Sequence, residues 1–430
     1  MANRKDRRMT GETTRSTSDC IAQMARDARE AQREVALLDD AAKSAALREI
    51  ANVLRASGEA ILSANAKDLA SGRDGGLAEA MLDRLALDEG RLEGIAGALE
   101  NVAQLPDPVG EVISRDDRPN GLELSRVRIP IGVIGIIYES RPNVTIDAAA
   151  LCFKSGNAAI LRGGSEAVHS NRALMQAFGE GLEKAGIPRQ IVQLVPTQDR
   201  AAVGAMLQAS GLIDMIVPRG GKSLVERVQR DARVPVLAHL DGICHTYVDR
   251  SADPETAKQV AVNAKMRRPG ICGAMETLLI DSAYPAAAEL CTALADSGCE
   301  LVGDGRARAL DPRIEEANEE DWDTEYLAPK LSIAIVDGLD AALGHIARHS
   351  SGHTDAVIAT DENVTERFLS EVDSAIVMAN ASSQFADGGE FGLGAEIGIA
   401  TGRLHARGPV ALEGLTTYKW QVRGSGQTRS

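Results

Sequence analysis

Cys272 stands among residues with which a thiol could carry out covalent chemistry. It follows the run Arg267-Arg268-Pro269-Gly270, after a helical pattern over residues 254–265, and it precedes a strand-like stretch over residues 275–280. The spacing places the cysteine on a turn between a helix and a strand, where a side chain can face a cleft. Two nearby guanidinium groups favour the thiolate, which is the nucleophilic form. The pattern predicts a covalent nucleophile, although a single cysteine is more often a small buried residue.

Two other turns combine paired glycines with cations. They are Arg162-Gly163-Gly164 and Arg219-Gly220-Gly221-Lys222, and each follows a strand-like stretch and precedes a helical one. Glycine lets the backbone approach a ligand, and the N-terminus of the next helix favours an anion. In a chain with a net charge of −15, the pair of turns predicts a phosphorylated nucleotide, including one that carries a 2′-phosphate. A tight loop is the alternative for either turn alone, because the chain has neither Gly-x-Gly-x-x-Gly nor a Walker sequence.

Other chemically capable residues carry weaker signals. His345, His349 and His353 recur at intervals of four residues, but Ser350-Ser351-Gly352 should end the helix before the third histidine. No carboxylate of the His-Glu-x-x-His type lies between them, so we expect no metal site and a structural or solvated role. Glu325 has no functional signal on its pattern alone.

Composition excludes several classes of protein. The chain has 430 residues, of which 44% are hydrophobic and 3% aromatic, and its pI of about 5.1 argues against nucleic acid or an anionic membrane as the main partner. No apolar run is long enough to cross a bilayer. Six cysteines without a Cys-x-x-Cys pair suit a reducing cytoplasm. Residues 1–20 are polar and are expected to form a disordered leader.

The chain alternates strands and helices in the manner of a parallel α/β fold. Residues 20–105 are expected to be helical, with breaks at 65–68 and 71–76, and residues 110–130 to form a hairpin around Asn120-Gly121. Strands and helices then alternate, which predicts a doubly wound parallel sheet with right-handed crossovers. The expected strands are 131–138, 157–161, 191–195, 212–217, 236–238, 246–249, 275–280, 331–336, 356–359 and 375–378. A last strand, 416–422, is expected to pair with the hairpin.

Several long runs resemble a known family in register. They include P-I-G-V-I-G-I-I-Y-E-S-R-P-N-V-T, N-A-K-M-R-R-P-G-I-C-G-A-M-E-T-L-L and F-G-L-G-A-E-I-G-I. From about residue 30 onward the chain resembles the aldehyde dehydrogenase superfamily and, within it, the γ-glutamyl phosphate reductase family. The resemblance implies an α/β, aldehyde dehydrogenase-like fold with three parts. These are a Rossmann-like NADP-binding domain (21–109 and 131–240), a catalytic domain (241–399) and an oligomerisation hairpin with a C-terminal strand (110–130 and 400–430).

The same resemblance implies the chemistry. It implies NADPH-dependent reduction of L-glutamyl 5-phosphate to L-glutamate 5-semialdehyde, the second step of proline synthesis from glutamate. Cys272 matches the nucleophile, and a dimer or tetramer is expected, with a separate glutamate 5-kinase as a candidate partner. Positions matched to the cofactor are Arg162, Gly163, Gly164, Arg219, Gly220, Gly221, Lys222 and Glu325, and candidates for the substrate's phosphate or carboxylate are Arg141, Asn143, Arg267, Arg268 and Arg407.

Two positions depart from the family pattern. His239 stands where the general superfamily has a glutamate that activates water, and Gly273 stands where the reductases often have asparagine. The absence of the glutamate at position 239 favours a reaction in which the acyl group is exchanged with phosphate and is not hydrolysed by water. An NAD-linked hydrolytic aldehyde dehydrogenase and a non-enzymatic nucleotide-binding scaffold are the alternatives; the first lacks its glutamate, and the second does not account for Cys272 and Glu325.

Overall fold

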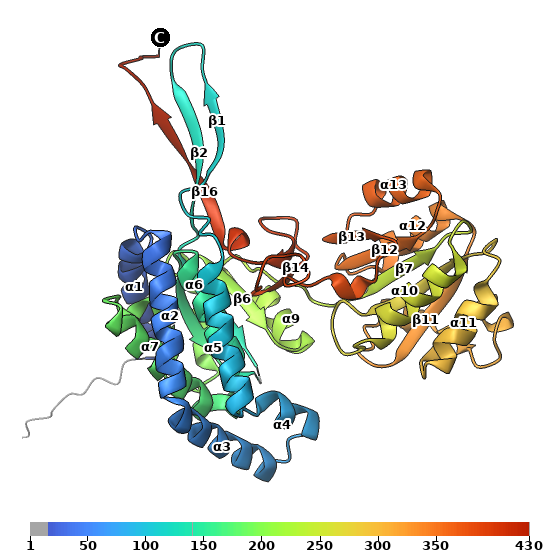
Figure 1. Cartoon of the computed structure of the whole chain (residues 1–430), viewed down its shortest axis with the longest axis horizontal. Helices are drawn as coiled ribbons and strands as arrows, with labels where there is room; N and C mark the ends of the chain where they lie inside the picture. Colours follow the sequence, from blue (N-terminus) through green and yellow to red (C-terminus); the bar gives the residue numbers. More distant parts are fainter. Residues whose placement is uncertain (1–15, 140, 430) are drawn as a thin grey trace, which may run out of the picture.

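The protein consists of two lobes and a projecting sheet (Figure 1). A computed structural model describes residues 16–139 and 141–429. Most of the predicted disordered leader, residues 1–20, lies outside the described residues, and its last four belong to a helix that begins at Thr17. No helix in the described ranges is both long and apolar enough to cross a membrane.

The first lobe is a four-stranded parallel sheet covered by helices. The strand order is β5-β4-β3-β6, and β3 is buried along its whole length, as expected of a central parallel strand. The strands are β3 (Val133–Tyr138), β4 (Ala158–Arg162), β5 (Val192–Leu194) and β6 (Met215–Arg219). The helices are α1 (Thr17–Val35), α2 (Asp40–Ala56), α3 (Gly58–Asp74), α4 (Glu79–Leu85), α5 (Glu89–Gln104), α6 (Pro142–Lys154), η1 (Ser165–Ala167), α7 (Val168–Lys184), η2 (Arg189–Ile191), α8 (Ala201–Leu207) and α9 (Lys222–Asp231).

Two expectations for this lobe are wrong. Residues 65–68 do not break a helix, because they lie inside α3. Two of their polar side chains are buried: Asn65 donates from Nδ2 to the carbonyl of Leu85 at 2.8 Å, and Asp68 accepts the backbone N–H of Ser170 at 2.7 Å. The strand expected at 236–238 is reduced to one isolated bridge between Val236 and Ile216.

The second lobe is built on a seven-stranded, wholly parallel sheet. Its strand order is β10-β9-β11-β8-β7-β12-β13. The strands are β7 (Cys244–Val248), β8 (Met275–Asp281), β9 (Glu300–Gly303), β10 (Glu315–Glu316), β11 (Lys330–Val336), β12 (Thr354–Ile358) and β13 (Ile376–Ala379). The helices are α10 (Pro254–Met266), α11 (Ala287–Asp296), η3 (Ala307–Ala309), η4 (Glu319–Asp323), α12 (Leu339–His349), α13 (Glu362–Glu371) and η5 (Ser383–Phe385).

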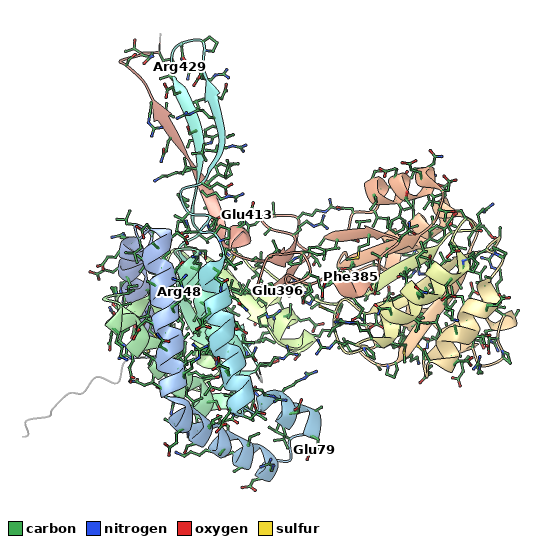
Figure 2. All side chains as sticks on the ribbon, in the orientation of Figure 1. Arg48, Glu79, Phe385, Glu396, Glu413 and Arg429 are labelled. Atoms are coloured by element: carbon green, nitrogen blue, oxygen red, sulfur yellow. The ribbon has the colours of Figure 1, made fainter. Side chains whose placement is uncertain are left out.

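The projecting sheet joins distant parts of the chain. The predicted hairpin, β1 (Val112–Asp117) and β2 (Glu123–Pro130), pairs antiparallel with β16 (Thr416–Arg423), as the sequence predicts. Before β16, the chain returns to the first lobe through β14 (Gly398–Ala400), β15 (Gly408–Val410) and η6 (Glu413–Leu415). Ile397, Val410 and Leu415 are buried in that lobe's core. This return anchors the segment that carries Glu396 between the two lobes (Figure 2).

Candidate active site

The Cys272 turn is held by buried contacts on both sides. It connects α10 to β8, as the sequence predicts. Lys265 and Glu276 form a fully buried ion pair of 2.5 Å between these two elements. Gly242 lies against the turn so closely that an added Cβ would be 2.2 Å from the Cys272 carbonyl oxygen, and the Cys244 Sγ donates to that oxygen at 3.1 Å. The backbone of Cys272 is therefore fixed by three neighbouring segments.

The thiol is not held as a thiolate in this environment. The pKa of Cys272 is raised to about 11, first by burial and then by the carboxylates of Glu325 and Glu396, while Arg219 acts against them. The expectation that Arg267 and Arg268 ionise the thiol is thus wrong. Both are exposed, and neither is among the groups that mainly shift the pKa of Cys272. A base must remove the thiol proton before Cys272 can act as a nucleophile at neutral pH.

Two histidines supply nitrogen lone pairs beside that thiol. Cys272, His239 and His353 each place one ligand atom so that all three atoms lie within 4.8 Å of one another. His239 Nδ1 is 2.8 Å from the carbonyl oxygen of Ile399, and burial lowers its pKa. Burial and the neighbouring His239 lower the pKa of His353 to about 3. Both imidazoles are therefore bases in their neutral form at pH 7.

The other two histidines of the expected series lie elsewhere. The helix α12 ends at His349, so His353 is not on it. His345 packs against Trp322 and His245, and His349 Nδ1 is 2.8 Å from Asp323. The structural interpretation fits His345 and His349, whereas His353 belongs to the Cys272 cluster.

Several arginines without an ion pair in the described residues line one pocket or act on the thiol. A pocket of about 440 Å³ is lined by Arg84, Arg141, Asn143 and Arg268, among others. The pKa of Arg141 is lowered first by burial and then by its neighbours Arg84, Arg219 and Arg268, while Cys272 raises it. Within the described residues, none of these four arginines forms an ion pair. Asp83 and Asp147 line the same pocket, so its positive charge is partly balanced, but guanidinium groups without an ion pair remain suited to bind an anion.

Two other arginines named from the sequence are engaged by protein groups. Arg267 Nη1 is 3.4 Å from the Gln384 side-chain oxygen. Arg407 donates from Nη1 to Asp373 at 2.9 Å and from Nη2 to the Asp373 carbonyl at 3.0 Å. The pocket thus includes Arg141, Asn143 and Arg268, but neither Arg267 nor Arg407.

The turn after β4 has unsatisfied polar atoms that suit a cofactor. Arg162 donates to the carbonyls of Gly163 and Gln198 at 2.7 and 3.0 Å. Its Nε and the Gln198 Oε1 are buried and have no hydrogen-bond partner within the described ranges. A Cβ on Gly163 would be 2.2 Å from Asn171 Nδ2, and one on Gly164 would be 2.2 Å from a Glu166 carboxylate oxygen. Close packing against the buried Asn171 disfavours a side chain at Gly163, and the orphaned atoms fit a polar ligand.

The turn after β6 already holds an anion. Glu139 accepts the backbone N–H of Gly221 at 3.0 Å, and a Cβ on Gly220 would be 2.3 Å from the same carboxylate. Lys222 pairs with Asp241 at 3.0 Å. The structure shows the expected attraction of this helix N-terminus for negative charge, but the anion that binds there is the carboxylate of Glu139.

Glu325 faces these groups from the second lobe. It accepts the backbone N–H of Gly242, and its pKa is raised by burial, with Asp241 raising it and Lys222 lowering it. Its position near both Lys222 and Cys272 places a hydrogen-bond acceptor between the cation turn and the thiol. Such a group can bind a hydroxyl, as the resemblance implies for a cofactor ribose.

Local patterns did not group His353 with Cys272, and they carried no signal for Glu396 or Arg84 as neighbours of the thiol. His353 and Glu396 lie about 80 and 120 positions from Cys272 along the chain, and Arg84 belongs to α4, in a region that reads as scaffold. Long-range folding, and no local pattern, brings these residues together.

The chain closely matches known proteins over nearly its full length. The sequence profile of the aldehyde dehydrogenase family matches residues 1–321. The gamma-glutamyl phosphate reductase of Novosphingobium aromaticivorans is 70% identical over 414 residues, covering 96% of this chain and 97% of that protein. The protein of the same name from Zymomonas mobilis is 63% identical, with the same shares covered.

Solved structures agree with this match. The crystal structure of gamma-glutamyl phosphate reductase from Thermotoga maritima superposes with a TM-score of 0.93 at 42% identity, covering 95% of this chain and 100% of that one. An acetylating aldehyde dehydrogenase from Geobacillus thermoglucosidasius, at 18% identity and a TM-score of 0.69 over 96% and 98% of the two chains, shares the fold. The chain therefore belongs to the aldehyde dehydrogenase family, among its gamma-glutamyl phosphate reductases.

Proposed function

We propose that this chain reduces L-glutamyl 5-phosphate to L-glutamate 5-semialdehyde with NADPH and releases phosphate, as the second step of proline biosynthesis from glutamate. One observation carries the proposal: Arg141 and Arg219, which have no carboxylate partner in the described residues, both interact electrostatically with the Cys272 thiol, and Arg141 shares a pocket with Arg84 and Arg268. The substrate has two anionic groups, a phosphate and an α-carboxylate, and guanidinium binds both in bidentate fashion. The names of the relatives point to the same substrate.

Cys272 forms the bond to the substrate. Because burial raises its pKa to about 11, His239 or His353 takes the thiol proton as the sulfur attacks the acyl carbon. The bond from that carbon to the phosphate oxygen then breaks, leaving a thioester on Cys272. The imidazolium returns its proton to the departing phosphate, which the arginines stabilise. Removing this base and keeping the thiol should therefore slow thioester formation.

The cofactor is assigned to the first lobe. When bound, NADPH supplies the hydride that converts the thioester into the semialdehyde. Arg162 and Gln198 offer their unsatisfied atoms, and Lys222 and Glu325 flank the route from that lobe to Cys272. At the end of the reaction Cys272 leaves as a thiolate and regains a proton from solvent.

Phosphate dependence tests the proposal against the hydrolytic alternative. In the reverse direction, the semialdehyde should reduce NADP⁺ continuously only when phosphate is added, because His239 replaces the water-activating glutamate. The Cys272→Ala variant should bind NADPH and lose turnover by roughly 10³-fold or more. Continuous oxidation without phosphate, or normal turnover in Cys272→Ala, would contradict the assignment.

The arginine pocket has an internal control. Arg141→Met and Arg268→Met should each raise the KM for the acyl phosphate by about 10- to 100-fold, as expected for a lost charged hydrogen bond. Arg91 lines the same pocket but is paired with Asp83 at 2.6 Å, so Arg91→Met should change KM by less than about threefold. Equal effects in all three variants would argue against a specific anion site.

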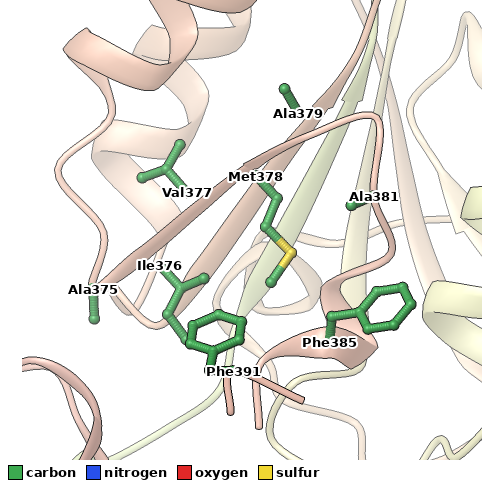
Figure 3. A pocket seen from close by; sticks show the side chains of 8 residues that line it. All are labelled: Ala375, Ile376, Val377, Met378, Ala379, Ala381, Phe385 and Phe391. Atoms are coloured by element: carbon green, nitrogen blue, oxygen red, sulfur yellow. The ribbon is translucent and has the colours of Figure 1, made fainter. Parts of the chain in front are cut away.

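Self-association is assigned to the projecting sheet. The edge strand β16 exposes about half of Tyr418, Trp420 and Val422, at 48%, 56% and 55%, which is unusual for large apolar side chains. The edge strand β13 of the second lobe also carries an apolar pocket, lined in part by Met378, Phe385 and Phe391 (Figure 3). We expect a dimer or tetramer that covers these surfaces, and Trp420→Glu should shift the sedimentation coefficient toward that of the monomer.

A separate glutamate 5-kinase is the candidate supplier of the acyl phosphate. A reducing cytoplasm suits the chain, since all six cysteines are free. Channelling can be tested by adding an excess of inactive reductase to the two-enzyme reaction, which should slow the flux only if the proteins associate.

A further inference from the structure

His239, Cys272 and His353 have the composition and geometry of a metal site. One nitrogen or sulfur atom from each lies within 4.8 Å of the other two. They come from three separate segments: the connection between the lobes, the turn before β8 and the residue before β12. Two imidazole nitrogens and a thiolate are the donor set that Zn²⁺ prefers, and three protein ligands with one open position are typical of accessible zinc sites.

The outer contacts orient both rings for this role. His239 Nδ1 is 2.8 Å from the Ile399 carbonyl oxygen, so Nδ1 carries the proton and Nε2 presents its lone pair. His353 Nδ1 is 2.9 Å from the Thr354 hydroxyl. Hydrogen bonds from the second ring nitrogen to a carbonyl or a hydroxyl are the usual support of metal-ligating histidines.

The remaining nitrogen of His353 needs a partner. The His353 side chain is fully buried, with 0% exposure. Its Nε2 has no hydrogen-bond partner among the described residues, and such an orphan is costly in a folded protein. The His353 and His239 rings meet edge to face with centroids 5.1 Å apart, so the two rings are neighbours in the cluster.

We propose that His239, Cys272 and His353 bind Zn²⁺ and that the bound ion blocks the thiol. A Zn–S bond forms, the thiol proton is released to the buffer, and no oxidation occurs. The sulfur lone pair is then engaged and cannot attack an acyl phosphate. The blocking effect rests on the proposed function, whereas the metal site itself does not.

Cobalt(II) is the probe for the site, because tetrahedral Co²⁺ absorbs in the visible range and a Co–thiolate bond adds a charge-transfer band in the near ultraviolet. We expect one Co²⁺ per chain, with both features displaced by Zn²⁺. Cys272→Ser should abolish the charge-transfer band, and His353→Gln should weaken Co²⁺ affinity by more than about 100-fold, more than the loss of an outer contact costs. The control His169→Ala, an exposed residue on α7, should bind as the unmodified chain does.

Two results would overturn the site: no charge-transfer band, or an unchanged band in Cys272→Ser. Inhibition is measured separately, as the loss of phosphate-dependent NADP⁺ reduction at low micromolar Zn²⁺ and its recovery with EDTA. If Co²⁺ binds through Cys272 but Zn²⁺ does not inhibit the reaction, the metal site stands. That result would contradict the proposed role of the Cys272 thiol in the reaction. If His353→Gln does not fold, His239→Gln gives the same test from the other ligand.

Discussion

The turns that follow β4 and β6 share the sequence Arg-Gly-Gly, yet their arginines are held differently. Arg162 is tied to the backbone carbonyls of Gly163 and Gln198. Arg219 has no ion pair within the described residues and instead lowers the pKa of Cys272 against the effect of Glu325 and Glu396. The same motif thus shapes a loop in one place and supplies charge to the thiol in the other. The position of a turn relative to the thiol, and not its sequence, separates the two roles.

The glycines of the two turns differ in the same way. Gly163 is enclosed, since an added Cβ would be 2.2 Å from Asn171. Gly221 is open, because the nearest atom to an added Cβ is a Glu139 oxygen at 4.0 Å. Its backbone N–H is nevertheless used, by that same Glu139. One turn is therefore constrained by packing and the other by electrostatics.

The largest expected effect is the difference in kinetics between variants of Arg219 and Arg162. Arg219→Met should lower kcat/KM by about 10- to 100-fold, because a charge-assisted contact worth about 1.5–3 kcal/mol is lost near the thiol. Arg162→Met should weaken NADPH binding and change kcat by less than about threefold at saturating NADPH. Steady-state kinetics on both variants give the comparison. Equal losses of kcat would mean that the two turns do not differ.

Substitutions at Gly163 and Gly221 should differ in their effect on the free energy of unfolding. Gly163→Ala should lower the free energy of unfolding by about 1–3 kcal/mol, because the new methyl group overlaps Asn171 in a packed site. Gly221→Ala should cost less than about 1 kcal/mol, since its φ of −69° suits alanine. Urea unfolding followed by circular dichroism measures both. A larger loss in Gly221→Ala would reverse the assignment of packing and charge.

Local patterns predicted the elements and a part of the site. The hairpin at Asn120-Gly121 and the turn that carries Cys272 follow from short-range signals, because turn residues and apolar periodicity act over a few positions. The cation that acts on the thiol was assigned wrongly, since closeness in sequence favoured Arg267 and Arg268 while the fold places Arg219 there. His353 is named from the sequence only in a series with His345 and His349. Its place beside Cys272 could not be predicted, because the pairing of β12 with β7 determines it.

The pH dependence of thiol labelling should follow Arg219. Between pH 7 and 9 the rate of Cys272 alkylation by iodoacetamide should rise about tenfold per pH unit, because the pKa of about 11 lies above this range and the thiolate reacts. Arg219 lowers that pKa, so its removal in Arg219→Met should raise the pKa and slow labelling up to about tenfold at each pH. Both proteins carry the Cys20→Ser substitution, so that the half-buried Cys20 does not contribute to the labelling. An unchanged profile in Arg219→Met would contradict the electrostatic role.

The smallest effect concerns Glu139. Glu139→Gln removes the carboxylate that accepts the Gly221 N–H and leaves the helix N-terminus without its negative charge. A phosphate of the cofactor should then bind more tightly by about 0.3–1 kcal/mol, or roughly two- to fivefold in Kd. Fluorescence titration with NADPH measures the change. Weaker binding would show that Glu139 supports the cofactor and does not compete with it.

The central claim is that Cys272 carries the acyl group and passes it to phosphate and not to water. The direct test mixes the protein with L-glutamate 5-semialdehyde and NADP⁺ in the absence of phosphate and follows NADPH by absorbance. We expect a single burst of one NADPH per chain, with a thioester on the Cys272 peptide in the mass spectrum, and continuous turnover once phosphate is added. Continuous NADPH formation before phosphate is added, or a burst that survives in Cys272→Ala, would contradict the account.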